Sequence, residues 1–122
     1  MKVLFVSAEV SPFVSVGGLS QVMYFLPKAL RNLGQDVRIF TAKYGAMDDN
    51  VVKNNWRFKT EVSGLSVPTD DVQKKDIICN VKSFYDSKNK LRAYFLENRE
   101  YYELRANVFG YRDDHVRFRL LS

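Results

Sequence analysis

The chain has 122 residues, of which 46% are hydrophobic and 27% are charged, and its formal net charge is +5. This composition is typical of one globular domain and excludes a disordered or fibrous chain. The single cysteine, Cys79, excludes an internal disulfide, and the apolar run after Met1-Lys2 is too short for a signal peptide or a membrane span. We therefore expect a cytoplasmic protein with no membrane partner.

The nineteen Lys and Arg residues are scattered along the chain from Lys2 to Arg119. Proteins that bind nucleic acids usually concentrate their basic residues on one face. The scatter favours a solvated basic surface with no nucleic-acid partner, and the positive charge also suits an acidic small substrate such as a diphosphate.

The first 44 residues predict a strand, a helix and a second, parallel strand. Residues 2–6 are continuously apolar, which is typical of a strand buried on both faces of a parallel sheet. Residues 36–41 predict the second strand. The helix between them is expected at about residues 18–33, because apolar residues recur there at three- and four-residue steps. Its predicted inward face comprises Leu19, Val22, Phe25 or Leu26, Ala29, Leu30 and Leu33.

Two residues mark the limits of this predicted helix. Gly34 lies just past its end, where glycine commonly terminates helices. Pro27 lies inside it and removes one main-chain hydrogen bond. We therefore expect a bent helix or two abutting pieces.

The middle of the chain, residues 50–97, predicts a β-rich insertion with antiparallel or mixed pairing. Strands are expected at residues 56–62, 76–84 and 91–96, and Ile77, Cys79 and Val81 alternate with polar residues as on a half-buried strand. The turn signals between these strands are Ser63-Gly64, Pro68-Thr69-Asp70-Asp71 and Asp86-Ser87-Lys88-Asn89.

The last segment, residues 98–122, predicts an irregular aromatic stretch up to Gly110 and then a short helix. Asp113 or Asp114 would cap that helix. Its apolar residues are Val116, Leu120 and Leu121. The expected fold class is therefore α/β, a Rossmann-like three-layer half-domain with a β-rich insertion, forming one partial domain over residues 1–122.

The stretch Ser15-Val16-Gly17-Gly18-Leu19 is the most informative motif of the chain. It joins the first predicted strand to the first predicted helix. Glycine lets a ligand approach the backbone closely, and a helix N-terminus favours an anion. The pair therefore indicates a phosphate-binding turn, although the spacing alone also fits a tight turn without a ligand.

A family resemblance rests on two stretches of sequence. Residues 1–44 read MKVLFVSAEVSPFVSVGGLSQVMYFLPKALRNLGQDVRIFTAKY, and residues 95–122 read FLENREYYELRANVFGYRDDHVRFRLLS. Both stretches resemble segments of bacterial glycogen synthases and plant starch synthases, in the family's order and at a family-like separation. The resemblance implies the two-domain GT-B architecture, with this chain as the first part of the acceptor-side domain.

The resemblance also implies an activity, namely retaining transfer of glucose from ADP-glucose or UDP-glucose to the non-reducing end of an α-1,4-glucan. It implies nucleotide-sugar contacts from Gly17, Gly18 and Ser15, where Ser15 stands in the place of the family's lysine. Gln21 stands in the place of a family aspartate. The family's His-Asp-Trp segment and its second domain do not occur in these residues, so the resemblance assigns no catalytic residue, metal or cofactor to them. We expect no transferase activity from the 122 residues alone.

Two other functional classes remain open. A non-catalytic glucan-binding or assembly module is suggested by Ser15 and Gln21, which stand at substrate-facing positions of the family. A dinucleotide-binding unit ranks last, because no G-x-G-x-x-G follows the first predicted strand.

Several single residues have a simple structural explanation beside a functional one. Glu9 follows the first predicted strand and could reach a cleft, but a solvated loop carboxylate is the simpler interpretation. Asp113 and Asp114 fit a helix cap better than a catalytic pair, because adjacent helical residues point about 100° apart. His115 cannot form a metal site alone, and we expect it to be partly exposed.

Core packing is the simpler explanation for the aromatic residues that could stack on sugar rings, namely Tyr94, Tyr101, Tyr102, Phe109 and Tyr111. Arg99 and Arg105 fit surface or structural pairing better than a phosphate or acceptor contact. Cys79 is expected to pack as a small hydrophobe. An incomplete sheet should leave apolar surface and a strand edge uncovered, so we expect self-association.

Overall fold

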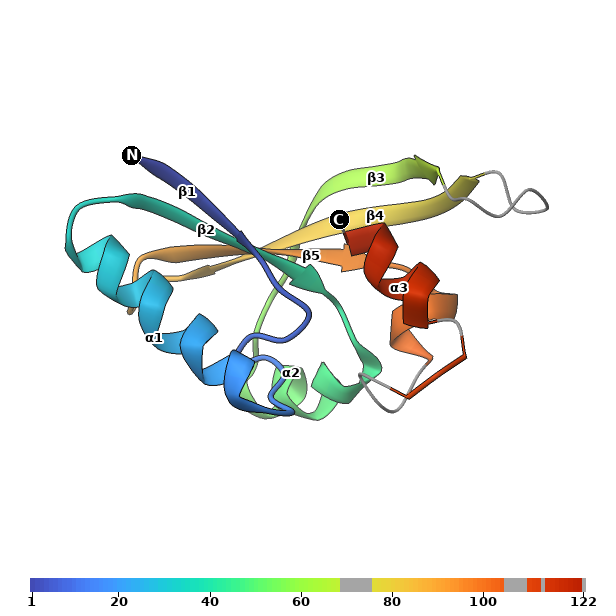
Figure 1. Ribbon diagram of the computed structural model, residues 1–122, viewed down its shortest axis with the longest axis horizontal. Helices are drawn as coiled ribbons and strands as arrows, with labels where there is room; N and C mark the ends of the chain where they lie inside the picture. Colours follow the sequence, from blue (N-terminus) through green and yellow to red (C-terminus); the bar gives the residue numbers. More distant parts are fainter. Residues whose placement is uncertain (69–75, 105–109, 113, 122) are drawn as a thin grey trace.

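The computed structural model describes residues 1–68, 76–104, 110–112 and 114–121. Its elements follow the chain in the order β1 (Lys2–Val6), α1 (Gly18–Asn32), β2 (Asp36–Ala42), η1 (Gly45–Met47), α2 (Asp48–Asn54), β3 (Lys59–Pro68), β4 (Asp76–Asp86), β5 (Leu91–Glu97), η2 (Arg99–Glu103) and α3 (Asp114–Leu121). The strands form one five-stranded sheet in the order β1-β2-β5-β4-β3 (Figure 1). The predicted α/β class is confirmed.

The sheet is mixed. The β1–β2 and β2–β5 pairs are parallel. The β5–β4 and β4–β3 pairs are antiparallel. The predicted β-rich insertion therefore extends the same sheet as the opening βαβ unit. Because β1, β2 and β5 run in one direction, their carboxyl ends lie at one edge of the sheet, where parallel α/β folds usually bind ligands.

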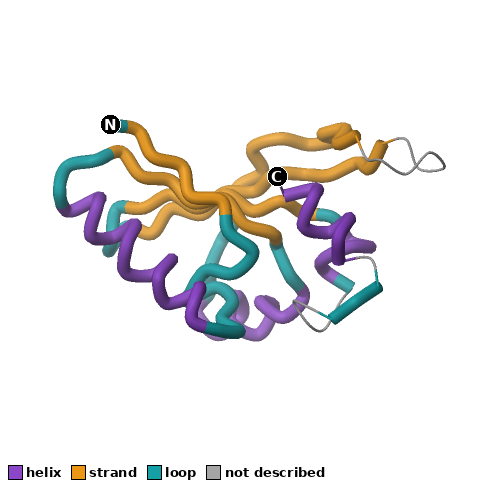
Figure 2. Tube along the Cα trace, in the orientation of Figure 1, coloured by secondary structure: helices purple, strands orange, loops and turns teal. Residues whose placement is uncertain are grey.

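Different helices pack against the two faces of the sheet, and Figure 2 shows α1 and α3 toward opposite ends of the strands. Met23 of α1 lines a small hollow together with Ile39 and Ala93, which share one face of β2 and β5. On the opposite face, Leu121 of α3 lines a hollow with Val6 at the end of β1. The arrangement is three layers, with α3 covering only the carboxyl end of the second face.

The core beneath the sheet is built around Phe13, which lies in the loop between β1 and α1. Its ring centroid lies 5.0 Å from those of Trp56 and Phe95 and 5.7 Å from that of Phe84, all in edge-to-face contacts. Edge-to-face aromatic pairs are favourable beyond the area that they bury. The loop after β1 is therefore anchored in the core and not free in solvent.

The predictions for β4, β5 and their turn are confirmed. Ile77, Cys79 and Val81 are buried on one face of β4 as expected. The Asp86 carboxylate accepts the main-chain N–H groups of Lys88 and Asn89 at 3.0 and 3.3 Å, which closes the hairpin. Such a local carboxylate contact explains why aspartate favours this turn.

The prediction that residues 2–6 are buried on both faces is wrong. β1 is the terminal strand of the sheet, and its residues Leu4 and Val6 are 60% and 51% exposed. Val3 and Phe5, on the side of α1, are half-buried. The apolar run fits a central strand, but in this chain no strand among the described residues lies beyond β1.

Helix α1 has the predicted span, but a different face of the helix packs on the sheet, and the helix is not divided at Pro27. The residues that face the sheet are Ser20, Met23 and Pro27, whereas the predicted inward face is turned outward, with Phe25 61% exposed. α1 contacts β2 and β5 and leaves its apolar stripe uncovered. The helix is continuous through Pro27, so the alternative of two abutting pieces is wrong. The left-handed φ of 87° at Gly34 ends it as expected.

The insertion differs from the expectation at its start. Helix α2 precedes the first strand of the insertion and has no counterpart among the predicted elements, and its acidic first turn (Asp48, Asp49) suits a helix N-terminus. β3 begins at Lys59 and passes through Ser63-Gly64 instead of turning there. Its pairing with β4 shifts register on either side of Val62, and Gly64 has a φ of 73°, as in a β-bulge.

The predicted short helix of the last segment is confirmed, but a cap by Asp114 is not. α3 begins at Asp114 itself, whose carboxylate accepts the N–H groups of Gly110 and Tyr111 before the helix, and Asp113 lies outside the described residues. Residues 99–103 form one π-helical turn instead of an irregular stretch, and the Asn98 side chain accepts the N–H of Tyr101 at 3.0 Å. Of the predicted turn at residues 68–71, Pro68 ends β3 and residues 69–71 lie outside the described residues.

Candidate functional site

The glycine motif lies in the connection between the carboxyl end of β1 and the N-terminus of α1. Ser7 continues the β1–β2 pairing, because its N–H donates to the Phe40 oxygen at 3.0 Å. Val10 and Val14 then close a narrow loop through a 2.9 Å main-chain bond, and both side chains are buried. The motif that follows is thus held at the ligand-binding edge of the parallel strands.

Gly18 is the first residue of α1, and no side chain caps the start of this helix. A Cβ atom at Gly18 would meet nothing within 4 Å among the described residues, and its φ is not in the left-handed region. Gly17 is extended, and a Cβ there would lie 3.6 Å from Glu9 Oε1, an ordinary contact. Neither the backbone nor the packing of the described residues requires glycine at these two positions.

Ser15 is exposed, and its hydroxyl oxygen lies 2.7 Å from that of the wholly buried Ser20. The Ser20 hydroxyl donates to the carbonyl oxygen of Gly17 at 2.7 Å. A serine hydroxyl has one proton. The Ser15 hydroxyl must therefore donate to Ser20, and it presents lone pairs to solvent.

Glu9 is not the solvated loop carboxylate that the sequence suggested. It is only 4% exposed, and its Oε2 accepts the main-chain N–H groups of Val16 and Gly17 at 2.7 and 3.0 Å. The interpretation was wrong because the loop folds back over the residue. One signal was available, since Glu9 is the only charged residue between Lys2 and Lys28, and a lone charge in an apolar stretch needs polar partners when buried.

A second polar cluster lies near the carboxyl ends of β2 and β5. Lys82 Nζ lies 2.7 Å and Lys43 Nζ 3.5 Å from Glu97 Oε2, and Lys43 Nζ also lies 3.8 Å from Glu103 Oε1. Burial raises the pKa of Glu97, but hydrogen bonds from Lys82 and Asn80 and the charges of both lysines outweigh it and lower the pKa to about 2. Burial raises the pKa of Glu103 above its usual range.

The two glutamates also line a hollow of about 500 Å³ beside η2. Each lysine faces a carboxylate, so this cluster is a compact ion network. The sequence does not reveal this cluster, because Lys82, Glu97 and Glu103 come from three different elements and Lys43 follows a fourth, so that only the folded sheet brings them together.

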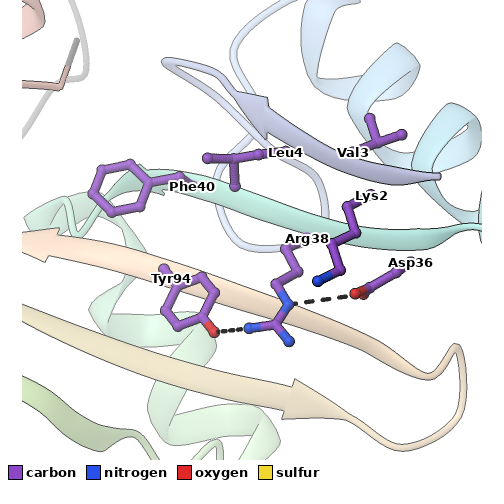
Figure 3. Close-up of a pocket in the computed structure, with 7 residues that line it drawn as sticks. All are labelled: Lys2, Val3, Leu4, Asp36, Arg38, Phe40 and Tyr94. Atoms are coloured by element: carbon purple, nitrogen blue, oxygen red, sulfur yellow. Dashed lines mark hydrogen bonds and ion pairs between the residues drawn. The ribbon is translucent and has the colours of Figure 1, made fainter.

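Another hollow, of about 460 Å³, lies on the open face of the sheet (Figure 3). Its floor is apolar, with Leu4, Phe40 and Tyr94 from three strands. Arg38 crosses its rim, where Nη1 donates to the Tyr94 hydroxyl at 2.6 Å and Nε lies 3.8 Å from Asp36 Oδ1. This hollow is on the face opposite α1, so it is separate from the glycine motif.

The remaining candidates have structural positions. Asp114 accepts N–H groups from Gly110 and Tyr111 and pairs with Arg117. Burial raises its pKa, but these contacts outweigh the burial and lower it. Tyr101 and Tyr102 are buried, Tyr94 and Tyr111 are half-buried, and His115 and Arg99 are exposed. Arg105 and Phe109 lie outside the described residues.

The described residues hold neither a metal-ligand cluster nor a membrane-spanning helix. No three His, Cys, Asp or Glu side chains in this part of the chain lie together as a metal site would require. Of the helices described, none has the length and apolar content needed to cross a membrane.

The parallel β1-α1-β2 unit, with a glycine loop at the carboxyl end of β1, defines a Rossmann-like α/β domain. A model of the starch synthase catalytic domain matches residues 2–122. The chain belongs to the starch synthase catalytic domain family, as the sequence resemblance implied.

Curated relatives agree with this assignment. The glycogen synthase of Caldicellulosiruptor bescii is 37% identical over 122 residues, which is 100% of this chain and 23% of the relative. The glycogen synthase of Clostridium acetobutylicum is 34% identical over 123 residues, covering 100% of this chain and 24% of the relative. The chain therefore spans about a quarter of the length of these relatives.

A solved structure shares the fold. The catalytic domain of starch synthase IV from Arabidopsis thaliana, determined with bound ADP and acarbose, superimposes with a TM-score of 0.79. The match covers 98% of this chain and 23% of that one, at 24% sequence identity.

Proposed function

We propose that the chain forms part of a retaining glucosyltransferase that moves glucose from ADP-glucose or UDP-glucose to an α-1,4-glucan. Support comes from the family match over residues 2–122 and from relatives named glycogen synthase that align with the whole chain. Because these alignments extend over the whole of this chain, they do not favour the alternative of a non-catalytic glucan-binding module. The cytoplasm is the proposed location, because the single cysteine suits a reducing compartment.

The observation that carries the proposal is Gly18. The described fold leaves open space where its side chain would be, at the uncapped start of α1 and at the ligand-binding edge of the sheet. Close approach of a ligand is then the remaining reason for glycine, and a helix N-terminus favours an anion. We assign Ser15, Gly17 and Gly18 to the nucleotide-sugar site, with Gly18 facing the donor's diphosphate.

Catalysis at such a site would be electrostatic. Main-chain N–H groups at the start of α1 would stabilise the negative charge that develops on the departing nucleoside diphosphate. Ser15 supplies no positive charge where the family has a lysine, so cations must come from elsewhere in the enzyme. The 122 residues alone are expected to be inactive.

The chain is also proposed to associate with a second copy of itself. No described strand pairs with the outer edge of β1, and exposed apolar side chains include Leu4 on the open sheet face and Val22 and Phe25 on α1. Pairing two β1 edges would satisfy the open edge and cover part of this apolar surface. Light scattering at high concentration tests this: we expect dimers that Leu4→Lys and Phe25→Lys weaken, and a strictly monomeric profile would contradict it.

The activity is testable in a hybrid enzyme, in which this chain replaces the matching segment of the Caldicellulosiruptor bescii glycogen synthase. We expect the hybrid to incorporate labelled glucose into glycogen, while the 122-residue chain alone incorporates none. A hybrid that is folded, as judged by circular dichroism and its melting transition, but inert with both donors would contradict the proposal.

A further inference from the structure

We infer that Glu9 is a positioning residue of the donor loop: its carboxylate fixes Val16 and Gly17 so that α1 presents Gly18 in one place. This inference rests on the proposed function of the loop. Nothing in the family resemblance assigns a role to Glu9.

The Glu9 carboxylate holds two points of the loop at once. A single oxygen, Glu9 Oε2, accepts two consecutive main-chain N–H groups, from Val16 at 2.7 Å and Gly17 at 3.0 Å. Bonds from N–H groups to a carboxylate are stronger than those between neutral partners. The carboxylate thus ties the start of the loop, just after β1, to its end, just before α1.

Gly17 is also held through its carbonyl group. Its carbonyl oxygen accepts the hydroxyl of Ser20, which is wholly buried and in turn accepts the hydroxyl of Ser15. Both polar main-chain groups of Gly17 are therefore engaged within the protein. The N–H groups of Val16 and Gly17 serve Glu9, so the donor's diphosphate meets the next residue, Gly18.

The carboxylate of Glu9 is buried. Glu9 is 4% exposed, and no Lys or Arg among the described residues pairs with it. A buried carboxylate is costly unless hydrogen bonds compensate it. Moving the loop would remove that compensation. The loop is therefore rigid before a donor binds, and a preformed site loses less entropy on binding.

Hydrogen exchange of the 122-residue chain tests the anchoring directly. In Glu9→Ala, the N–H groups of Val16 and Gly17 should exchange at least about tenfold faster than in the wild type. Glu9→Gln keeps an acceptor oxygen, so exchange should stay within about threefold, with both amide proton resonances shifted upfield because the acceptor is neutral. The control is Asp49→Ala, which removes an exposed carboxylate.

Two outcomes of that experiment would overturn the anchoring. One is unchanged exchange of Val16 and Gly17 in Glu9→Ala. The other is that the amide proton resonances of Val16 and Gly17 do not change in Glu9→Gln. This second outcome decides the question if Glu9→Ala fails to fold. Neither outcome bears on whether the loop contacts a donor.

The hybrid enzyme tests the effect on the donor. Glu9→Ala should raise the donor KM about tenfold or more and change kcat less than about threefold, and Glu9→Gln should recover most of the loss. If Glu9→Ala speeds exchange at Val16 and Gly17 but leaves the donor KM unchanged, Glu9 holds the loop without positioning the donor, and the proposed positioning role is wrong. If the unsubstituted hybrid is inert, the proposed function and the donor role of Glu9 fail together, whereas the exchange result still decides the anchoring.

Discussion

Nε of Arg117 in α3 donates to the main-chain oxygen of Tyr101 in η2 at 2.7 Å. The guanidinium is wholly buried, its Nη1 lies 2.7 Å from Asp114 Oδ1, and its central carbon lies 4.8 Å from the ring centre of Tyr111. The Tyr102 hydroxyl closes the unit by donating to the Arg117 oxygen. One arginine thus joins α3 to η2 at the carboxyl end of the sheet.

Arg117→Ala should lower the free energy of unfolding by about 3 kcal/mol, because it removes a wholly buried guanidinium together with its contacts to the Tyr101 oxygen and the Asp114 carboxylate. Urea denaturation followed by circular dichroism measures the change. Arg57→Ala, at an exposed position, is the control and should stay within about 0.5 kcal/mol. Equal stability of the two variants would show that Arg117 does not hold α3 in place.

The pH dependence of stability should follow Glu97. Its pKa is lowered from 4.5 to about 2, so ionised Glu97 stabilises the folded state above pH 4.5 and loses that effect as the pH falls toward 2. Glu97→Gln should lower the melting temperature at pH 7 and make its decline between pH 4.5 and 2 shallower. A decline as steep as in the wild type would contradict the ion network.

Glu103→Gln provides the matched comparison, because the pKa of Glu103 is raised, first of all by burial. A group with a raised pKa favours the folded state when protonated, so its ionised form is a cost at neutral pH. Glu103→Gln should therefore raise the melting temperature at pH 7. If both substitutions lower it equally, the two carboxylates do not differ as described.

The two glycines at the ends of α1 should differ in how much folding stability is lost when each is replaced by alanine. Gly34 has a left-handed φ of 87°, so Gly34→Ala should cost about 1 kcal/mol. Gly18→Ala meets no neighbour among the described residues, so its stability should stay within about 0.5 kcal/mol of the wild type. Urea denaturation measures both. A large loss in Gly18→Ala would mean that the fold itself requires this glycine.

Much of the fold could be predicted from local patterns. Gly34 at a helix end, the alternation of Ile77, Cys79 and Val81, and the turn at Asp86 each depend on neighbours within a few residues. The outward face of α1 could not be predicted in this way, because which stripe is buried depends on the strands that the helix crosses. The same limit applies to β1, since an apolar run does not reveal whether a further strand pairs with it.

The candidate site shows a similar division. Gly17 and Gly18 stand out by residue type alone, and their place in the donor site stays a prediction. Glu9 was misjudged, since its two partners, Val16 and Gly17, are seven and eight residues away and meet it only when the loop folds back. Side-chain partners at that separation are set by tertiary packing and not by sequence spacing.

Ser15→Lys tests whether the donor site lacks the positive charge that the family's lysine would supply. In the hybrid enzyme it should lower the donor KM about threefold to tenfold, because a lysine charge near a diphosphate strengthens binding. Rates with ADP-glucose and UDP-glucose, at low and high salt, measure the effect. An unchanged KM at low salt would indicate that another group already supplies the charge.

The most direct measurement is the donor KM of the hybrid enzyme carrying Gly18→Val, with Asn32→Val at the exposed far end of α1 as the matched control. If Gly18 faces the donor's diphosphate, Gly18→Val should raise the KM by at least about tenfold at an unchanged melting temperature, while Asn32→Val leaves it unaltered. Equal donor KM values in the two variants would contradict the assignment of the glycine loop to the donor site.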